Sequence, residues 1–261
     1  MHPAPPRGID TTQPSIARVY DYWLDGKDNF AVDRELAEQL LSLNPGMRQW
    51  ARDNRAFLCA AATRAVQEGG INQFLDLGAG LPASPSIHEA VREVSPGARF
   101  AYVDFDPVAV LHAQALLHKQ DGLVAILADL TQTAAVLSHP DMAKTLDLGR
   151  PLGIILGGVA HFMPAPTVRD VVAGYLSQVT AGSWLILSTA RTESTQVESQ
   201  LKSAYTAAES YAHSAEDFRS FFDGTEIMPP GLREARRWIA GMQAAPPTNE
   251  LYSLCGAGVK R

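Results

Sequence analysis

Phe74-Leu75-Asp76-Leu77-Gly78-Ala79-Gly80 is the most informative stretch of this 261-residue sequence. Its short apolar run predicts a buried β-strand, and the glycines that follow allow the backbone to turn tightly and to approach a ligand closely. In a parallel sheet such a turn lies beside the amino terminus of the next helix. The stretch therefore predicts a ligand-binding loop after the first strand of an α/β sheet.

The residues around the glycines distinguish between two kinds of nucleoside cofactor. Residues 78–83 fit the loose dinucleotide pattern G-x-G-x-x-G/A. Asp76, however, would repel a pyrophosphate but suits an ammonium group. Pro82 and Pro85 delay the next helix and remove backbone N–H donors that a pyrophosphate needs. The loop thus favours S-adenosylmethionine, and an NAD-dependent oxidoreductase remains the alternative.

Further acidic residues follow at the ends of the next two predicted strands. Asp104 and Asp106 end the second strand, and a carboxylate there suits the two hydroxyls of a ribose. Phe105 lies between them and suits an adenine ring, while Asp106 also fits the cap of the following helix. Asp129 ends the third strand, where it suits the adenine amino group. Ligands of open parallel sheets bind outside the carboxyl ends of the strands, so one ligand can reach all these acids.

Apolar runs alternate with helical patterns through the middle of the chain. Strands are predicted at 74–77, 98–105, 123–128, 152–156 and 184–188, with helices at 86–94, 107–117, 131–137 and 165–179 between them. Strands without polar alternation indicate a parallel sheet covered on both faces, which is a doubly wound, Rossmann-like α/β fold. Helices are expected at 15–23, 33–43, 47–67, 195–210 and 214–222, and an edge strand at 252–259.

The sequence resembles class I S-adenosylmethionine-dependent methyltransferases, and more closely an actinobacterial S-adenosyl methyltransferase family formerly described as a domain of unknown function. Four segments carry the resemblance, at residues 9–22, 26–30, 73–82 and 102–107. The resemblance implies a seven-stranded sheet with a reversed C-terminal hairpin, in which the segment from Thr225 onward supplies strand six and 252–259 strand seven. The sequence departs from the broad methyltransferase pattern at its third glycine position, where Pro82 stands.

The resemblance also implies a set of cofactor-binding residues. Asp76, Gly78 and Gly80 would line the methionine end, Asp104 the ribose and Asp129 the adenine. The full set of candidates is Tyr20, Tyr22, Asp76, Gly78, Ala79, Gly80, Asp104, Phe105, Asp106, Asp129, Leu130 and Gly157.

One further residue is a candidate for catalysis, and two of the residues above are also candidates for a lid over cofactor or acceptor. His161 follows Gly157 and Gly158 at the end of the fourth strand and is the candidate catalytic base, although a histidine at a strand end is also often a structural hydrogen-bonding group. Tyr20 and Tyr22 precede the sheet and are candidates for a lid, or alternatively pack between helix and sheet.

The segment boundaries follow from composition and pattern. Residues 1–14 contain four prolines and few apolar groups, so we expect a flexible N-terminal arm. Residues 15–261 are expected to form a single methyltransferase domain. Within it, 15–70 would form a helical cap, 71–189 the cofactor-binding core, and 190–261 a helical insertion and the C-terminal hairpin.

Composition narrows the classes of partner. The net charge of -6 predicts no binding of nucleic acid or anionic membranes. Cys59 and Cys255 lack metal-ligand spacing, which predicts neither a metal site nor a disulfide. With no run of about 20 apolar residues, we expect a cytoplasmic protein. The sequence therefore predicts methyl transfer to a small or medium organic acceptor. A non-catalytic regulatory protein that binds S-adenosylmethionine or S-adenosylhomocysteine is the alternative.

Overall fold

A computed structural model describes residues 10–118, 120–240 and 251–261. Most of the predicted N-terminal arm, residues 1–9, lies outside this part of the chain. The described residues form one eight-stranded sheet in the order β3-β2-β1-β4-β5-β8-β6, and the short β7 pairs with β8 beside this path. The strands are β1 Gln73–Leu77, β2 Arg99–Asp104, β3 Leu123–Leu127, β4 Gly153–Gly157, β5 Trp184–Thr192, β6 Thr225–Ile227, β7 Arg233–Glu234 and β8 Leu251–Lys260.

The strand order confirms the doubly wound fold with a reversed hairpin. Strands β1 to β5 pair in parallel, whereas β8 runs antiparallel to β5 and β6. The chain proceeds outward from β1 to β3 and then returns to place β4 on the other side of β1. The order therefore reverses between β1 and β4, and the crevice outside the carboxyl ends of these two strands is where such sheets bind ligands.

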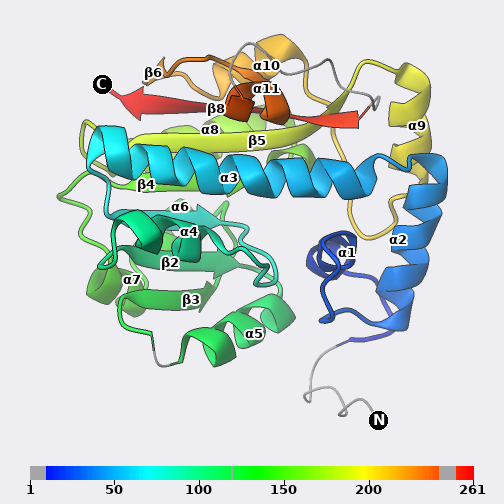
Figure 1. Cartoon of the computed structure of the whole chain (residues 1–261), viewed down its shortest axis with the longest axis horizontal. Helices are drawn as coiled ribbons and strands as arrows, with labels where there is room; N and C mark the ends of the chain where they lie inside the picture. The colour runs from blue at the N-terminus through cyan, green and yellow to red at the C-terminus, as the bar shows by residue number, and fades with distance from the viewer. Residues whose placement is uncertain (1–9, 119, 241–250) are drawn as a thin grey trace.

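Helices cover both faces of the sheet (Figure 1), and for this reason the central strands bury apolar side chains on both faces. One face is covered by α3 Met47–Gly69, α4 Ile87–Val94, α5 Pro107–Leu117 and α11 Ala235–Ala240. The other is covered by α6 Thr133–Leu137, α7 Pro140–Thr145, α8 Ala165–Ser177 and α10 Ala215–Ser220. Phe74 and Phe100 stack at 4.7 Å on the first face, while Leu75 and Leu77 are buried on the second.

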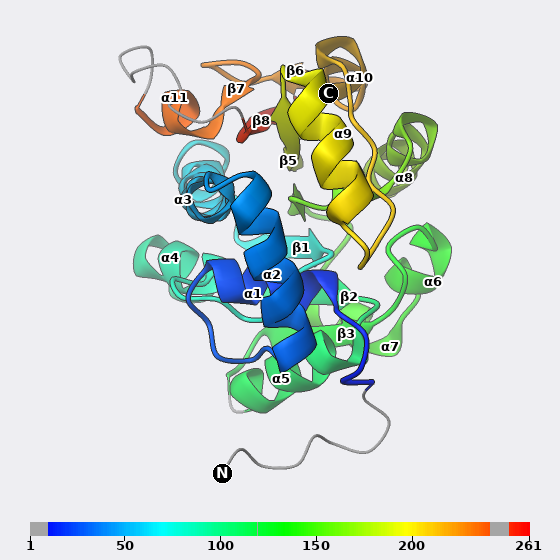
Figure 2. The same cartoon turned by 90° about the vertical axis from the view of Figure 1, so that its right-hand side faces the viewer.

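Three further helices lie beyond the carboxyl ends of the parallel strands (Figure 2). They are α1 Ile16–Trp23, α2 Ala31–Leu43 and α9 Thr195–Ala204. Val19, Leu40 and Trp50 belong to the apolar cluster that joins α1, α2 and the start of α3, and Leu201 of α9 packs against it. A fully buried ion pair between Arg18 Nε and Asp33 Oδ2, at 2.8 Å, links α1 to α2. These contacts hold α1 above the crevice.

Two expectations from the sequence are wrong. Residues 252–259 do not form an edge strand, because β8 lies between β5 and β6. The helix expected at 195–210 ends at Ala204. The segment after it runs in space beside the 3-10 helix η1 Ala160–Phe162. There the N–H of Tyr211 donates to the carbonyl of His161 at 2.8 Å, a tertiary contact that local periodicity does not contain. The short helices α7 and α11 were not expected.

Candidate active site

A cavity of about 600 Å³ opens at the carboxyl ends of the parallel strands, below α1 and α9. The strand ends and the loops after them contribute Asp76, Gly78, Ala79, Gly80, Asp104, Phe105, Asp106, Asp129, Leu130, Gly157 and His161. The helices contribute Ile16, Tyr20, Trp50, Leu201 and Tyr205, among others. Apart from Tyr22, all the candidate residues line this one cavity.

The glycine loop has the backbone conformation that the sequence predicts. Gly78 and Gly80 have φ angles of 73° and 65°, in the left-handed region that favours glycine. A Cβ on Gly78 would lie 2.5 Å from Cγ1 of Val159, so packing also excludes a side chain there. On Gly80 the nearest atom would be Cβ of Ala17, at 3.9 Å. The loop therefore presents bare backbone to the cavity.

Asp76 supplies a buried carboxyl at the end of β1. Its side chain is 5% exposed, and no other described residue makes a hydrogen bond to it. Burial raises the pKa of Asp76 to about 7, although Arg55 on α3 lowers it. A carboxyl that lines a cavity without a partner is suited to a ligand cation.

Asp104 is held rigidly at the end of β2. Its Oδ2 accepts from the N–H of Gly80 at 2.7 Å, and its Oδ1 accepts from the N–H of Asp106 at 2.8 Å. Burial raises its pKa, while these backbone hydrogen bonds lower it. Each carboxylate oxygen has room for another donor. Phe105 beside it is 65% exposed, which leaves its ring available to a flat ligand.

Asp106 lines the cavity, but both its oxygens already have partners. Oδ1 caps α5 by accepting from the N–H of Val108 at 2.8 Å. Oδ2 accepts from Oγ of Ser15 at 2.5 Å. The sequence allowed Asp106 to bind the ribose or to cap α5, and the geometry favours the cap. The hydrogen bond to Ser15 also connects the end of β2 to the start of α1, which the sequence did not indicate.

The segment after β3 is also ordered by its own hydrogen bonds. Oδ1 of Asp129 accepts from both the N–H and the Oγ1 of Thr131, each at 2.8 Å. The carbonyl of Leu130 accepts from the hydroxyl of Tyr175 at 2.8 Å. Asp129 is exposed, so its second oxygen is available to a ligand.

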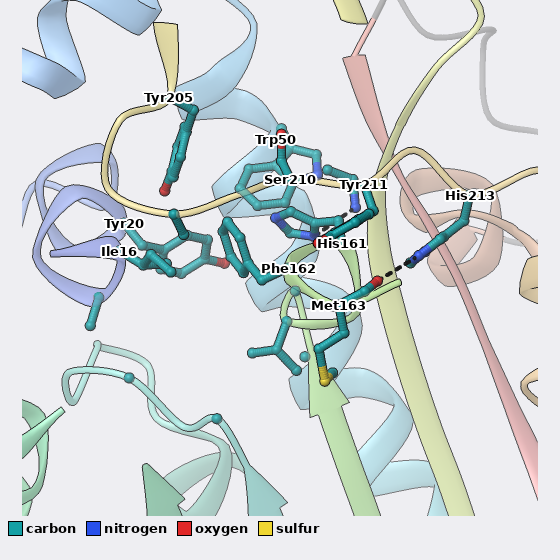
Figure 3. Close-up of a pocket in the computed structure, with 18 of the residues that line it drawn as sticks. Ile16, Tyr20, Trp50, His161, Phe162, Met163, Tyr205, Ser210, Tyr211 and His213 are labelled. Atoms are coloured by element: carbon teal, nitrogen blue, oxygen red, sulfur yellow. Dashed lines mark hydrogen bonds between the residues drawn. The ribbon is translucent and has the colours of Figure 1, made fainter. Parts of the chain in front are cut away.

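His161 lies in η1 and lines the cavity on the side of the helices (Figure 3). Its Nδ1 accepts from the N–H of Ala190 at 3.3 Å. Burial lowers the pKa of His161 to about 3, and the neighbouring His213 makes a smaller contribution in the same direction. The imidazole is therefore neutral at physiological pH. Because Nδ1 accepts, the hydrogen-bond pattern assigns the ring proton to Nε2.

The side chains of the two lid candidates, Tyr20 and Tyr22, point in different directions from α1. Tyr20 lines the cavity, donates to the carbonyl of Ala51 at 3.0 Å and accepts from Asn54 Nδ2 at 3.0 Å. Tyr22 lies outside the cavity lining, where its hydroxyl donates to Glu38 and its ring packs against Arg48. Successive residues at this spacing point in different directions around a helix, so only Tyr20 faces the site.

Sequence reasoning missed several residues of the cavity. Trp50 lies in the helix predicted at 47–67 and Tyr205 in the helix predicted at 195–210, and no motif marks either residue. Arg55 carried no motif, yet its Nε donates to the carbonyl of Pro85 at 2.9 Å and its charge influences Asp76. Only the packing of α3 and α9 against the strand ends brings these side chains to the site.

The described residues show neither a metal-binding cluster nor a membrane-spanning helix. They contain no cluster of three or more His, Cys, Asp or Glu side chains that could hold a metal ion. No helix among them combines the length and the apolar character that a membrane span requires.

Comparison with known proteins identifies the family. A family model described as S-adenosyl methyltransferase matches residues 2–261. The chain belongs to this family. A candidate methyltransferase from Thermobifida fusca shares 34% sequence identity, with a TM-score of 0.91 over 98% of each chain. A DUF574 family protein from Streptomyces avermitilis is 29% identical, with a TM-score of 0.89 over 97% of this chain and 99% of its own. The resemblance inferred from the sequence is thus confirmed.

A more distant structure agrees in fold alone. Magnesium protoporphyrin IX methyltransferase from Synechocystis, with bound S-adenosylhomocysteine, has a TM-score of 0.54 at 16% identity, over 86% of this chain and 93% of its own. No curated protein matches the sequence. Membership of the S-adenosyl methyltransferase family makes S-adenosylmethionine the cofactor, in preference to NAD. The unpartnered carboxyl of Asp76 beside a bare glycine loop fits the cationic amino group of this cofactor.

Proposed function

We propose that this protein transfers the methyl group of S-adenosylmethionine to a small or medium-sized organic acceptor. The observation that carries the proposal is the set of acidic residues on three successive strand ends around one cavity, namely Asp76, Asp104 and Asp129. When bound, the cofactor supplies a methyl group already activated on a sulfonium. The protein therefore contributes mainly alignment and the exclusion of water.

The assignments on the cofactor side follow the polarity of the cavity. Asp76 binds the methionine amino group, and the loop from Gly78 to Gly80 approaches the methionine backbone. Asp104 accepts from the ribose hydroxyls, with its orientation fixed by the N–H of Gly80. Phe105 packs against adenine, while Asp129 and Leu130 lie at its edge. Asp106 acts indirectly, by fixing α5 and α1.

The acceptor occupies the part of the cavity below the helices, beside Tyr20, His161 and Tyr205. Residues 15–261 then work as a single domain, in which 15–70 and the segment after β5 cover a site built on 71–189. The cavity continues from the glycine loop to these helices, which supports a second binding region beside that of the cofactor and therefore catalysis rather than cofactor storage. The free thiols Cys59 and Cys255 support a reducing compartment, the cytoplasm.

Calorimetric titration with S-adenosylmethionine, S-adenosylhomocysteine and NAD tests the cofactor site. We expect the two adenosyl sulfur compounds to bind and NAD to give no heat. Asp104→Ala should weaken their binding by about 1.5–3 kcal/mol, the usual contribution of charge-assisted hydrogen bonds. Binding of NAD alone would overturn the proposal.

Turnover tests catalysis separately from binding. Formation of S-adenosylhomocysteine with any member of an acceptor panel would establish transfer. If the protein binds the cofactor tightly and no acceptor ever yields S-adenosylhomocysteine, the regulatory alternative is favoured instead.

A further inference from the structure

The hydrogen bonds of His161 make this residue a donor toward the cavity. Nδ1 accepts from the N–H of Ala190 at 3.3 Å, so the proton of the neutral ring is on Nε2. Nε2 has no hydrogen-bond partner among the described residues, and it is not one of their buried unpartnered atoms. It is therefore open to the cavity that His161 lines. For Nε2 to act as a base, Nδ1 would have to carry the proton and face the N–H of Ala190, which would oppose two donors.

The two tyrosines beside His161 are not suited to replace it as a base. The titratable or charged residues that α1, β5, α9 and the segments after β5 and α9 contribute to the cavity are Tyr20, Arg191, Glu193, Glu198, Lys202, Tyr205, Tyr211 and His213. Glu193 accepts from Nε of Arg191 at 2.9 Å and from the hydroxyl of Tyr252 at 2.7 Å. Burial raises the pKa of Tyr20 and of Tyr205, and both remain protonated.

Neither ring nitrogen of His213 is available as a base. Its Nε2 donates to the carbonyl of Met163 at 3.0 Å, and its Nδ1 is buried. Arg191 is a permanent cation and donates to Glu193 and to the carbonyl of His213. His161 itself thus presents an N–H donor, and not a proton acceptor, to a ligand beside it.

Aromatic rings surround the same space (Figure 3). The ring of Trp50 lies 5.6 Å from that of Tyr20 and 5.8 Å from the imidazole of His161. Phe162 lies 4.2 Å from His161 and 5.7 Å from Tyr205. All five side chains line the cavity. Such surroundings favour a flat aromatic ligand.

The donor at Nε2 distinguishes between acceptor atoms. An amine nitrogen has one lone pair, and a hydrogen bond from His161 would occupy the pair that must attack the methyl group. A protonated amine would place its own N–H against Nε2–H. An oxygen has further lone pairs, so it can accept from His161 and still attack.

We propose, on the basis of the function proposed above, that the acceptor is a small phenol that binds as its phenolate, with the oxygen accepting from Nε2–H of His161. The phenol loses its proton to solvent before it binds, so the transfer itself moves no proton. The phenolate oxygen forms the new C–O bond, the C–S bond breaks, and the electron pair of that bond goes to sulfur. His161 is in this arrangement an oxyanion donor and not a general base.

Titration of bound 4-nitrophenol tests this directly, because its phenolate absorbs visible light and no turnover is needed. The full-length protein is saturated with S-adenosylhomocysteine and 4-nitrophenol, and the phenolate band is followed against pH. We expect the apparent pKa of the bound phenol to lie about one to two pH units below that of the free compound, as a charge-assisted hydrogen bond requires. An unchanged or raised pKa, or a failure of 4-nitrophenol to bind, would overturn the proposal.

Variants show whether the shift comes from His161. His161→Phe keeps a ring against Trp50 and Phe162 but lacks the donor, so the shift should disappear. His161→Gln restores an N–H donor and should recover most of it. His118→Gln, on a residue outside the cavity lining, should behave as the unaltered protein does. A full shift in His161→Phe, with circular dichroism showing a folded protein, would contradict the proposal.

Two further ligands separate the remaining chemistries. If benzylamine binds more tightly than 4-nitrophenol, the site selects an amine and the proposal is wrong. If 4-nitrobenzoate binds in a way that depends on His161 while 4-nitrophenol does not, the acceptor is a carboxylate, which also overturns it. Binding of S-adenosylhomocysteine without binding of 4-nitrophenol would refute this inference and leave the proposed cofactor function intact.

Discussion

At the scale of single residues, the buried carboxyl of Asp76 couples cofactor binding to pH. Its pKa of about 7 in the free protein means that part of the population is protonated near neutrality. A cationic amino group beside it favours the ionised form, so binding below pH 7 must release a proton. We expect the affinity for S-adenosylmethionine to fall by about tenfold for each pH unit below 7. Calorimetric titration at intervals of about half a pH unit, from about pH 5.5 to about pH 8.5, measures how the affinity changes with pH.

The same carboxyl should destabilise the protein when no cofactor is bound. The pKa in the folded state lies well above the usual value of an aspartate, so the stability present at low pH is lost as pH rises through about 7. At about 1.4 kcal/mol per pKa unit, the cost above pH 8 is on the order of 4 kcal/mol. Asp76→Asn should therefore raise Tm at pH 8 while it weakens cofactor binding. A variant that is less stable than the parent at pH 8 would refute this explanation.

Gly78 offers a test of the loop that does not depend on any ligand. Gly78→Ala places a side chain at a φ of 73° and 2.5 Å from Val159, so we expect a loss of about 1–3 kcal/mol in the free energy of unfolding. Denaturant unfolding measures it. Gly97→Ala is the matched control, because a Cβ on Gly97 meets no atom within 4 Å and its φ lies outside the left-handed region. Equal effects of the two substitutions would show that packing at Gly78 is not the cause.

At the scale of elements, the Arg18–Asp33 ion pair determines how α1 sits above the cavity. Both side chains are buried, and Asp33 also accepts from the N–H groups of Ser15 and Phe30. Arg18→Met leaves a buried carboxylate without its cation, which typically costs about 3–5 kcal/mol. We expect lower stability, faster hydrogen exchange in α1 and weaker cofactor binding.

A second substitution separates loss of the pair from loss of packing. Arg18→Met combined with Asp33→Asn removes the uncompensated charge, so it should recover part of the stability lost in Arg18→Met. If the double variant is as unstable as the sum of the two single variants, the pair contributes no coupling. Arg34→Met serves as a control on the same helix as Asp33, because Arg34 is exposed and its hydrogen bonds go to Asn29.

At the scale of the whole molecule, cofactor binding should stabilise the folded chain as one unit. The cavity is lined by segments from α1 to β8, so a ligand there contacts elements far apart in sequence. Saturation at 100 times Kd should add about 2.7 kcal/mol to the free energy of unfolding. Thermal unfolding with S-adenosylhomocysteine should show a raised Tm in a single transition. Separate transitions for the helices and the sheet would show that they do not fold together.

Local patterns in the sequence determined most of the fold. The apolar runs predicted β1 to β5, and the pattern over 86–94 predicted α4, whose first turn has a capping box between Ser86 and Glu89 in the structure. Both were predictable because burial on both faces and helix capping depend on residues close together in the sequence. The acids at the strand ends were readable for the same reason, since parallel strands share one carboxyl edge. Asp76, Asp104 and Asp129 thus reach one cavity as the sequence predicted.

Only the tertiary structure decided what depends on contacts between distant segments. The end of α9 and the interior position of β8 follow from pairing with η1, β5 and β6, and no local pattern contains these partners. The direction in which the His161 proton points depends in the same way on the N–H of Ala190, 29 residues further along the chain. The sequence by itself thus determined the family, the sheet and the row of acidic residues at its carboxyl edge. Packing decided the opposite side of the cavity, because that side is built from helices whose relative placement is set by long-range contacts.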